Sequence, residues 1–199
     1  MPGVWAILLA AGESSRMGQL KALLPWRDTT LIEHQLRSLL DAGVQQVIVV
    51  LGHDADRLKP IVEAVPGASW TLNEDYLQGK TTSLKAGVAA LTGQELSDVL
   101  LLNVDQPRSA DTVRTLLERH RAWSYRITIP THGGRGGHPI FIAAELLPEL
   151  VDIEEETQGL KAVVRRHAEA TERFEVDDPT VLWDLNTPEQ YQQAVDSGF

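Results

Sequence analysis

The sequence contains no cysteine among its 199 residues. This absence excludes disulfide bonds, metal sites with thiolate ligands and a cysteine nucleophile. A chain without disulfides is compatible with a reducing compartment.

Long apolar runs and a positive charge excess are also missing. No segment approaches the roughly 20 apolar residues that span a bilayer. No Lys or Arg precedes the apolar residues 4–11, so we interpret them as a buried strand and not as a signal peptide. The net charge of −10 provides no broad cationic field for a polyanion. We therefore expect a cytoplasmic protein that binds neither membranes nor nucleic acid.

Two common phosphate-binding motifs are absent as well. The sequence has no G-x-x-x-x-G-K followed by Ser or Thr, and no G-x-G-x-x-G. These absences argue against a P-loop NTPase and against a nicotinamide enzyme.

Continuous apolar runs alternate with segments of helical periodicity. This alternation is typical of parallel strands covered by helices on both faces. The length and the 43% hydrophobic content fit one domain over residues 1–199. We expect strands at 4–10, 47–51, 69–72, 98–103, 126–130, 171–176 and 181–185. We expect helices at 31–40, 54–65, from Thr81 or Thr82 to 91, at 111–123, 143–151, 159–169 and from Thr187 onward.

The first apolar strand leads into a polar loop that contains two cations, Arg16 and Lys21. Small residues at 10–12 allow the backbone to approach a ligand, and successive amide groups in such a turn bind anions. Arg offers a planar fork of donors to phosphoryl oxygens, and Lys offers a mobile point charge. The layout indicates a site for a nucleoside triphosphate. An ordinary turn with solvated cations is the alternative, and the residue types alone leave both open.

Polar residues follow two other apolar segments. Asp105 comes directly after the very apolar run 98–103, and Asp184 and Asn186 alternate after another run. Ligands of an open α/β sheet bind outside the carboxyl ends of its strands, and Mg²⁺ near phosphates uses one or two carboxylates. Asp105 is thus a candidate metal ligand. Turn and cap roles are the alternatives for all three residues.

A loop at 131–139 carries four glycines and His138. Such a loop is either a flexible turn or a place where the backbone lies against a ligand, and it makes His138 a candidate substrate contact. The other histidines show no metal-ligand spacing with it. No serine lies in the G-x-S-x-G turn of a hydrolase.

Together these segments resemble a known family. Residues 9–18 and Lys21 resemble the signature of nucleotidyltransferases. Further matches narrow the resemblance to the molybdenum cofactor nucleotidyltransferases, and among these to the cytidylyltransferases. These matches are Asn73-x-x-Tyr76-x-x-Gly79-x-x-x-Ser83-Leu84-x-x-Gly87, Asp105-Gln106-Pro107, Gly137-His138-Pro139 and Asp184-x-Asn186-Thr187-Pro188.

The resemblance runs over nearly the whole chain and implies an α/β fold, a three-layer Rossmann-like sandwich with a mostly parallel central sheet, as in nucleotide-diphospho-sugar transferases. It implies catalytic roles for Arg16, Lys21 and Asp105, which would bind the triphosphate and its metal. The implied nucleotide-binding residues are Ala10, Ala11, Gly12, Glu13, Ser14, Ser15, Gly79 and Ser83.

The resemblance also implies a metal and an acceptor. Asp105 and Asp184 would hold Mg²⁺, with Mn²⁺ as an alternative. His138, Pro139 and Asn186 would face a pterin substrate. Family members that use GTP tend to carry Gly at the position of Ala11, so Ala11 favours CTP.

The implied reaction transfers CMP from CTP to the terminal phosphate of molybdopterin or its molybdenum-loaded form and releases pyrophosphate. A molybdoenzyme would then accept the product. Three alternatives stay open: a guanylyltransferase on the same cofactor, a nucleotidyltransferase on a sugar phosphate or another small phosphate, and a non-catalytic chaperone of the molybdenum cofactor.

Overall fold

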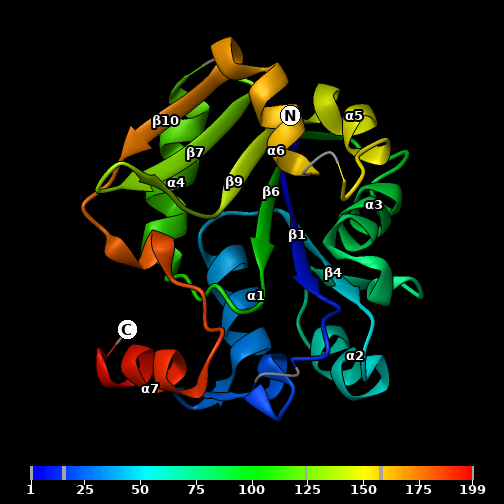
Figure 1. Ribbon diagram of the computed structural model, residues 1–199, viewed down its shortest axis with the longest axis vertical. Helices are drawn as coiled ribbons and strands as arrows, with labels where there is room; N and C mark the ends of the chain where they lie inside the picture. The colour runs from blue at the N-terminus through cyan, green and yellow to red at the C-terminus, as the bar shows by residue number, and fades with distance from the viewer. Residues whose placement is uncertain (1, 15–16, 124, 157–158, 199) are drawn as a thin grey trace.

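The computed structural model describes residues 2–14, 17–123, 125–156 and 159–198 (Figure 1). The strands are β1 (Gly3–Ala10), β2 (Pro25–Trp26), β3 (Thr29–Thr30), β4 (Gln46–Leu51), β5 (Ala68–Leu72), β6 (Leu96–Asn103), β7 (Ile127–His132), β8 (Arg135–Gly136), β9 (Ile140–Ala143) and β10 (Thr171–Glu175). The helices are α1 (Leu31–Asp41), α2 (Ala55–Glu63), α3 (Lys80–Ala90), α4 (Ala110–Ala122), α5 (Leu147–Val151), α6 (Leu160–Arg166) and α7 (Pro188–Asp196).

A central sheet has the strand order β10-β7-β9-β6-β1-β4-β5, and β8 pairs with β7. The pairs β6–β1, β1–β4, β4–β5 and β10–β7 are parallel. Strand β9 runs antiparallel to both of its neighbours, β6 and β7. The sheet is therefore mostly parallel, with one reversed strand inside it.

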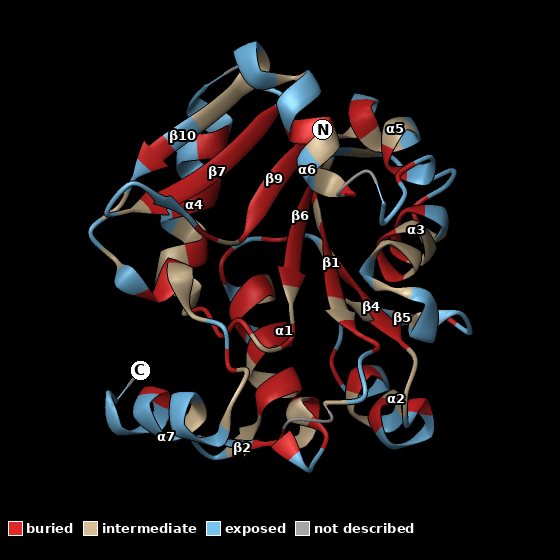
Figure 2. Ribbon diagram, in the orientation of Figure 1, coloured by how far each residue is buried: buried red, intermediate tan, exposed pale blue. Residues whose placement is uncertain are grey.

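Two apolar cores lie on opposite faces of this sheet. Helices α1, α2 and α4 supply one core with residues such as Leu36, Leu58 and Val113. Helices α3, α5 and α6 supply the other with residues such as Leu84 and Leu150. The inner strands β1, β4, β7 and β9 are buried along most of their length, whereas the edge strands β5 and β10 are not (Figure 2). The predicted three-layer α/β fold is confirmed.

Local signals explain where α1 begins and ends. The Thr30 hydroxyl accepts a hydrogen bond from the Glu33 amide, which satisfies one free donor of the first turn. Gly43, just after the helix, has φ +98, a conformation that glycine adopts without a Cβ penalty. The predicted helix at 31–40 is thus confirmed, as are the expected helices that correspond to α2, α4 and α7.

Two expectations about secondary structure are wrong, and one strand was not predicted. Residues 181–185 form no strand, because Pro179–Leu182 is a 3₁₀ turn in which the Asp178 carboxylate accepts from the Thr180 amide. Helix α3 begins after Gly79 and not after Thr81 or Thr82. The short strand β9 was not expected, since four apolar residues have too little length to show a period.

A third, smaller core joins both ends of the chain. Leu185 and Ala194 from the C-terminal segment pack with Met17, Trp26 and Leu31. Helix α7 therefore lies beside the β2–β3 hairpin, away from the main sheet (Figures 1 and 2). Among the described residues, no helix combines the length and the apolar content needed to cross a membrane.

Candidate functional site

The strand ends predicted to form the site do meet. Strands β1 and β6 are adjacent and parallel, with Leu9 opposite Asn103. The loop after Ala10 and the loop after Asn103 consequently leave the sheet at the same edge. Two cavities open here, and they share lining residues that include Asp105 and Asn186.

The smaller cavity has a volume of about 430 Å³. Its wall includes nine of the predicted site residues: Ala10, Ala11, Gly12, Ser14, Lys21, Gly79, Ser83, Asp105 and Asn186. Glu13 is exposed and is not part of the wall. Ser15 and Arg16 lie outside the described residues.

The opening loop is shaped by a turn at Ser14. Ser14 has φ +55, its carbonyl accepts from the Met17 amide at 2.9 Å, and its hydroxyl accepts from the Lys21 amide at 3.0 Å. Position 52 requires glycine, because a Cβ there would lie 2.8 Å from both the Cβ and the carbonyl oxygen of Ala11. The loop thus lies directly on the segment that follows β4.

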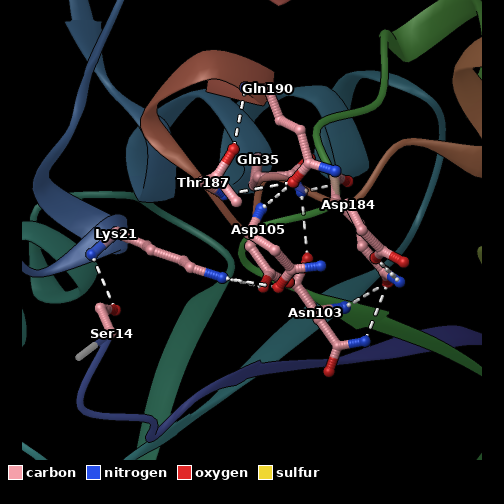
Figure 3. Close-up of polar contacts among 10 residues, drawn as sticks. Ser14, Lys21, Gln35, Asn103, Asp105, Asp184, Thr187 and Gln190 are labelled. Atoms are coloured by element: carbon pink, nitrogen blue, oxygen red, sulfur yellow. Dashed lines mark hydrogen bonds and ion pairs between the residues drawn. The ribbon is translucent and has the colours of Figure 1, made fainter. Parts of the chain in front are cut away.

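Lys21 joins three distant segments (Figure 3). Its Nζ lies 2.7 Å from Asp105 Oδ2 and donates to Asn186 Oδ1 at 3.0 Å. The Lys21 side chain is largely buried, with a relative exposure of 12%. Asn186, expected on the acceptor side, lies between the two cavities and lines both.

The larger cavity has a volume of about 830 Å³. His138, Asp105, Asp184 and Asn186 line it, as do four cations: Lys80, Lys161, Arg165 and Arg173. In the parts of the chain that the structure describes, the side chains of Lys80, Lys161 and Arg173 have no hydrogen bond or ion pair. An anionic ligand would give them partners.

The side chain of Gln106 contacts three segments that meet at this edge of the sheet. Gln106 Oε1 accepts from the backbone amide of Asn103 at 3.0 Å and from its side chain at 2.9 Å. Gln106 Nε2 lies 2.7 Å from Asp184 Oδ1 and 3.1 Å from His138 Nδ1. Gln106 is only 3% exposed, so it acts as an internal brace.

A fully buried cation lies behind the larger cavity. Arg108 has no exposed surface and donates to the carbonyls of His138 (2.9 Å), Pro107 (2.7 Å) and Val181 (2.7 Å). Burial lowers the pKa of Arg108 to about 10, which still leaves the guanidinium charged at neutral pH. Its backbone amide donates to Gln35 of α1. The arginine therefore joins the backbone of His138 to that of two other segments, at Pro107 and Val181.

His138 is largely enclosed. Burial, and then the charge of Arg108, lower the pKa of His138 to about 4, so the imidazole is neutral at pH 7. Its amide donates to the Val181 carbonyl at 2.9 Å. Pro139 was expected to face the acceptor; it is buried and lines neither of the two cavities, because it leads directly into the buried strand β9.

The glycines of the loop before His138 have structural explanations. Gly133 and Gly134, with φ +57 and +74, form the turn between β7 and β8. A Cβ on Gly137 would lie 2.4 Å from the Val181 carbonyl oxygen. The close approach is to the protein's own backbone, although Gly136 and Gly137 also line the larger cavity.

The carboxylate oxygens of Asp105 and Asp184 suit a divalent cation. The described residues hold no group of three or more His, Asp or Glu side chains that could enclose a metal. Mg²⁺ near phosphates does not need such a cage, since one or two carboxylates with waters and phosphate oxygens suffice. Asp105 and Asp184 offer these carboxylates, and Lys21 already provides a positive charge at Asp105.

Several residues of the site were not predicted from the sequence. Gln106 lies in a quoted motif but was given no role, and Gln35, Arg108 and the three unpaired cations of the larger cavity were not singled out. The signal that could have found two of them is the polar run Gln106-Pro107-Arg108 directly after the most apolar strand. The cations come from separate elements and left no local pattern.

Comparisons with known proteins agree with the fold. Residues 6–171 match the family described as the MobA-like NTP transferase domain. The chain is 32% identical to the nicotine blue oxidoreductase of Paenarthrobacter nicotinovorans, covering 96% of this chain and 95% of that protein. It is 28% identical to the molybdenum cofactor cytidylyltransferase of Escherichia coli strain K12, covering 98% of this chain and 96% of that protein.

Solved structures of similar proteins have the same fold. The Rv0371c protein of Mycobacterium tuberculosis matches with a TM-score of 0.83 and 26% identity, covering 98% of each chain. A complex of that protein with manganese has also been solved and matches with a TM-score of 0.79 and 26% identity, covering 98% of this chain and 99% of that one. A nucleotidyl transferase from Methanothermobacter matches with a TM-score of 0.82 and 26% identity, covering 98% and 97%.

Proposed function

The chain belongs to the family of MobA-like NTP transferase domains, and on this premise we propose that it transfers CMP from CTP to the terminal phosphate of molybdopterin or its molybdenum-loaded form. The main observation in support of the proposal is that the two cavities share part of their wall. Asp105 and Asn186 line both, and Lys21 touches both residues. A donor in one cavity and an acceptor in the other would meet at these side chains.

The reaction is an in-line displacement. A phosphate oxygen of the acceptor forms a bond to the α-phosphorus of CTP, the bond from that phosphorus to the bridging oxygen of the β-phosphate breaks, and pyrophosphate leaves. The nucleophile is already an anion, so the protein needs no strong base. Its task is to position the reactants and to stabilise developing charge.

The residues of the smaller cavity would bind CTP. The amides of the loop from Ala11 to Ser15 would hold the triphosphate, and Lys21 and Arg16 would neutralise it. Gly79 and Ser83 would lie beside the base. Ser83 is only 7% exposed, and its hydroxyl accepts from Asn73 at 2.9 Å, which holds it in place.

Asp105 and Asp184 would hold Mg²⁺, or Mn²⁺ in its place. The metal would supply positive charge to the phosphate oxygens during transfer. Asp105 lines both cavities and Asp184 lines the larger one, and Gln106 restrains Asp184 through one of its oxygens. The manganese complex of the mycobacterial structure is compatible with this role.

The larger cavity would bind the acceptor. Its three unpaired cations suit a small molecule that carries several negative charges, despite the net charge of −10. His138 and Asn186 would contact the pterin. A sugar phosphate is the alternative acceptor, and GTP is the alternative donor.

One of the similar proteins suggests a second candidate function. The relative named nicotine blue oxidoreductase is 32% identical over nearly the full length, so the same scaffold accompanies a redox activity there. An oxidoreductase reaction is therefore the second candidate for this chain.

One experiment separates these functions. The purified protein is incubated with Mg²⁺, the molybdopterin acceptor and either CTP or GTP, and the product mass and pyrophosphate are measured. We expect the cytidylyl product. Formation of the guanylyl product alone would assign GTP as the donor, and binding of the acceptor without any pyrophosphate would favour a chaperone. Parallel samples with NADH or NADPH and a dye acceptor test the redox candidate by absorbance.

A further inference from the structure

The side-chain amide of Gln106 can have only one orientation. Oε1 faces the backbone N–H of Asn103 at 3.0 Å, and a backbone N–H is always a donor. If the amide were turned over, its NH₂ group would face that N–H, and two donors would meet. The NH₂ group must therefore face Asp184 and His138, at 2.7 Å and 3.1 Å.

This orientation decides the proton on His138. Gln106 Nε2 has two protons, and its two neighbours are Asp184 Oδ1 and His138 Nδ1. Because Nε2 donates, His138 Nδ1 must accept, so Nδ1 carries no proton. A neutral imidazole without a proton on Nδ1 carries its proton on Nε2.

The second ring nitrogen has no such partner. Among the described residues, His138 Nε2 makes no hydrogen bond or ion pair, and His138 lines the larger cavity. The backbone around the ring is held in place by Arg108, which binds the His138 carbonyl, and by Val181, which accepts from the His138 amide. The ring is thus held on its inner side and open on the other.

We propose that Gln106 is a positioning residue that fixes His138 as the Nε2–H tautomer, and that His138 donates one hydrogen bond from Nε2 into the larger cavity. The ligand atom that it recognises is a hydrogen-bond acceptor, such as a carbonyl oxygen, a ring nitrogen with a free lone pair or a phosphoryl oxygen. His138 does not act as a base, because its only basic nitrogen is used by Gln106. The identification of that ligand as the acceptor substrate rests on the proposed function.

Nuclear magnetic resonance tests the tautomer without any substrate. Protein labelled with ¹⁵N-histidine is studied at neutral pH through long-range couplings between ring protons and ring nitrogens. The His138 signals are assigned by their loss in the His138→Asn variant. We expect a protonated Nε2 and an unprotonated Nδ1. A proton on Nδ1, alone or together with Nε2, would overturn the proposal.

A variant tests the role of Gln106. In Gln106→Glu combined with Asp184→Asn, the new carboxylate still accepts from the Asn103 amide, and the second substitution removes the carboxylate that lies 2.7 Å from the same position. The ionised carboxylate can no longer donate to the ring, so at about pH 8 Nδ1 of His138 should gain a proton and donate to it. An Nδ1 that stays unprotonated in this variant, with an unchanged circular dichroism spectrum, would contradict the positioning role.

A matched pair of His138 variants tests the donated bond. The side chain of Gln can place an N–H near the position of the histidine Nε2, whereas the shorter Asn reaches only the position of Nδ1. His138→Asn should raise the acceptor KM about threefold to tenfold, the range of a lost neutral hydrogen bond, while His138→Gln should retain most of the affinity. The KM for CTP should not change in either variant. Equal effects of the two variants would refute the donated bond, and absence of turnover in the wild type would refute the proposed function while leaving the tautomer test intact.

Discussion

The two cavities of the site are built in different ways. The smaller one is formed largely by short stretches of consecutive residues, the loop at 10–14 with Lys21 and the start of α3 at Gly79. The larger one is formed by side chains from many separate elements, and Gln106 and Arg108 hold those elements together. The difference shows that the loop of the smaller cavity is encoded locally, whereas the larger cavity depends on a buried polar network.

The largest expected effect concerns the wall that the cavities share. Lys21→Ala and Asp105→Ala should each lower kcat by about 10²–10³, because each removes a group that stabilises charge in the transition state. Release of pyrophosphate measures the loss, and circular dichroism verifies the fold. Near-normal turnover in both variants would mean that the two cavities do not share a reaction centre.

The next largest effect should distinguish the larger cavity from the smaller one. Arg108→Met should lower the free energy of unfolding by about 3 kcal/mol or more, since three carbonyls each lose a hydrogen bond from the guanidinium. Urea denaturation measures this change. In the folded fraction, the acceptor KM should rise while the affinity for CTP is retained, because Arg108 binds the carbonyl of His138, which lines only the larger cavity. Parallel losses of affinity for both substrates would remove the distinction between the two regions.

A smaller effect is expected from the cations of the larger cavity. Lys161→Ala and Arg173→Ala should each raise the acceptor KM about threefold to tenfold, with kcat and the KM for CTP unchanged. The matched control is Arg37→Ala, which removes the same charge from the exposed face of α1 at a residue that lines neither cavity. The proposed acceptor cavity would be in doubt if the control raised the acceptor KM equally.

The smallest effect concerns the choice of base. Ala11 lines the smaller cavity and is 4% exposed, so its methyl group contributes directly to the shape of the wall. Ala11→Gly should shift the ratio of kcat/KM for CTP and GTP towards GTP by no more than about tenfold. Gly12→Ala is the control, because a methyl group there meets no atom within 4 Å. A larger shift in the control than in Ala11→Gly would argue against a specificity role for Ala11.

Much of the fold could be predicted because its signals are local. The apolar runs of β1, β4 and β6 and the periodicity of α1 depend only on neighbouring residues. Strand β9 could not be predicted in the same way, and its direction matters: it is antiparallel to β6, with Ile140 opposite Leu101. The beginning of β9 therefore lies near the end of β6, and this brings His138 to the site.

The site was predictable where it depends on residue type and position after a strand. Lys21, Asp105 and Asn186 do meet, although the sequence placed Asn186 with the acceptor alone. The roles of Gln106 and Arg108 could not be predicted, because their contacts connect residues up to 78 positions apart. A buried arginine that binds carbonyls has no pattern in the sequence.

The start of α7 has a consequence for the motions of the protein. Gln190 Oε1 accepts from the amides of Asn186 and Thr187, so Asn186 is bonded to the first turn of the helix. The same helix packs through the third core on residues on both sides of Lys21, among them Met17 and Leu24. Amide protons of these two remote segments should therefore exchange with solvent as a single opening unit. Substrate affinity then depends on the local stability of a helix whose own residues line neither cavity.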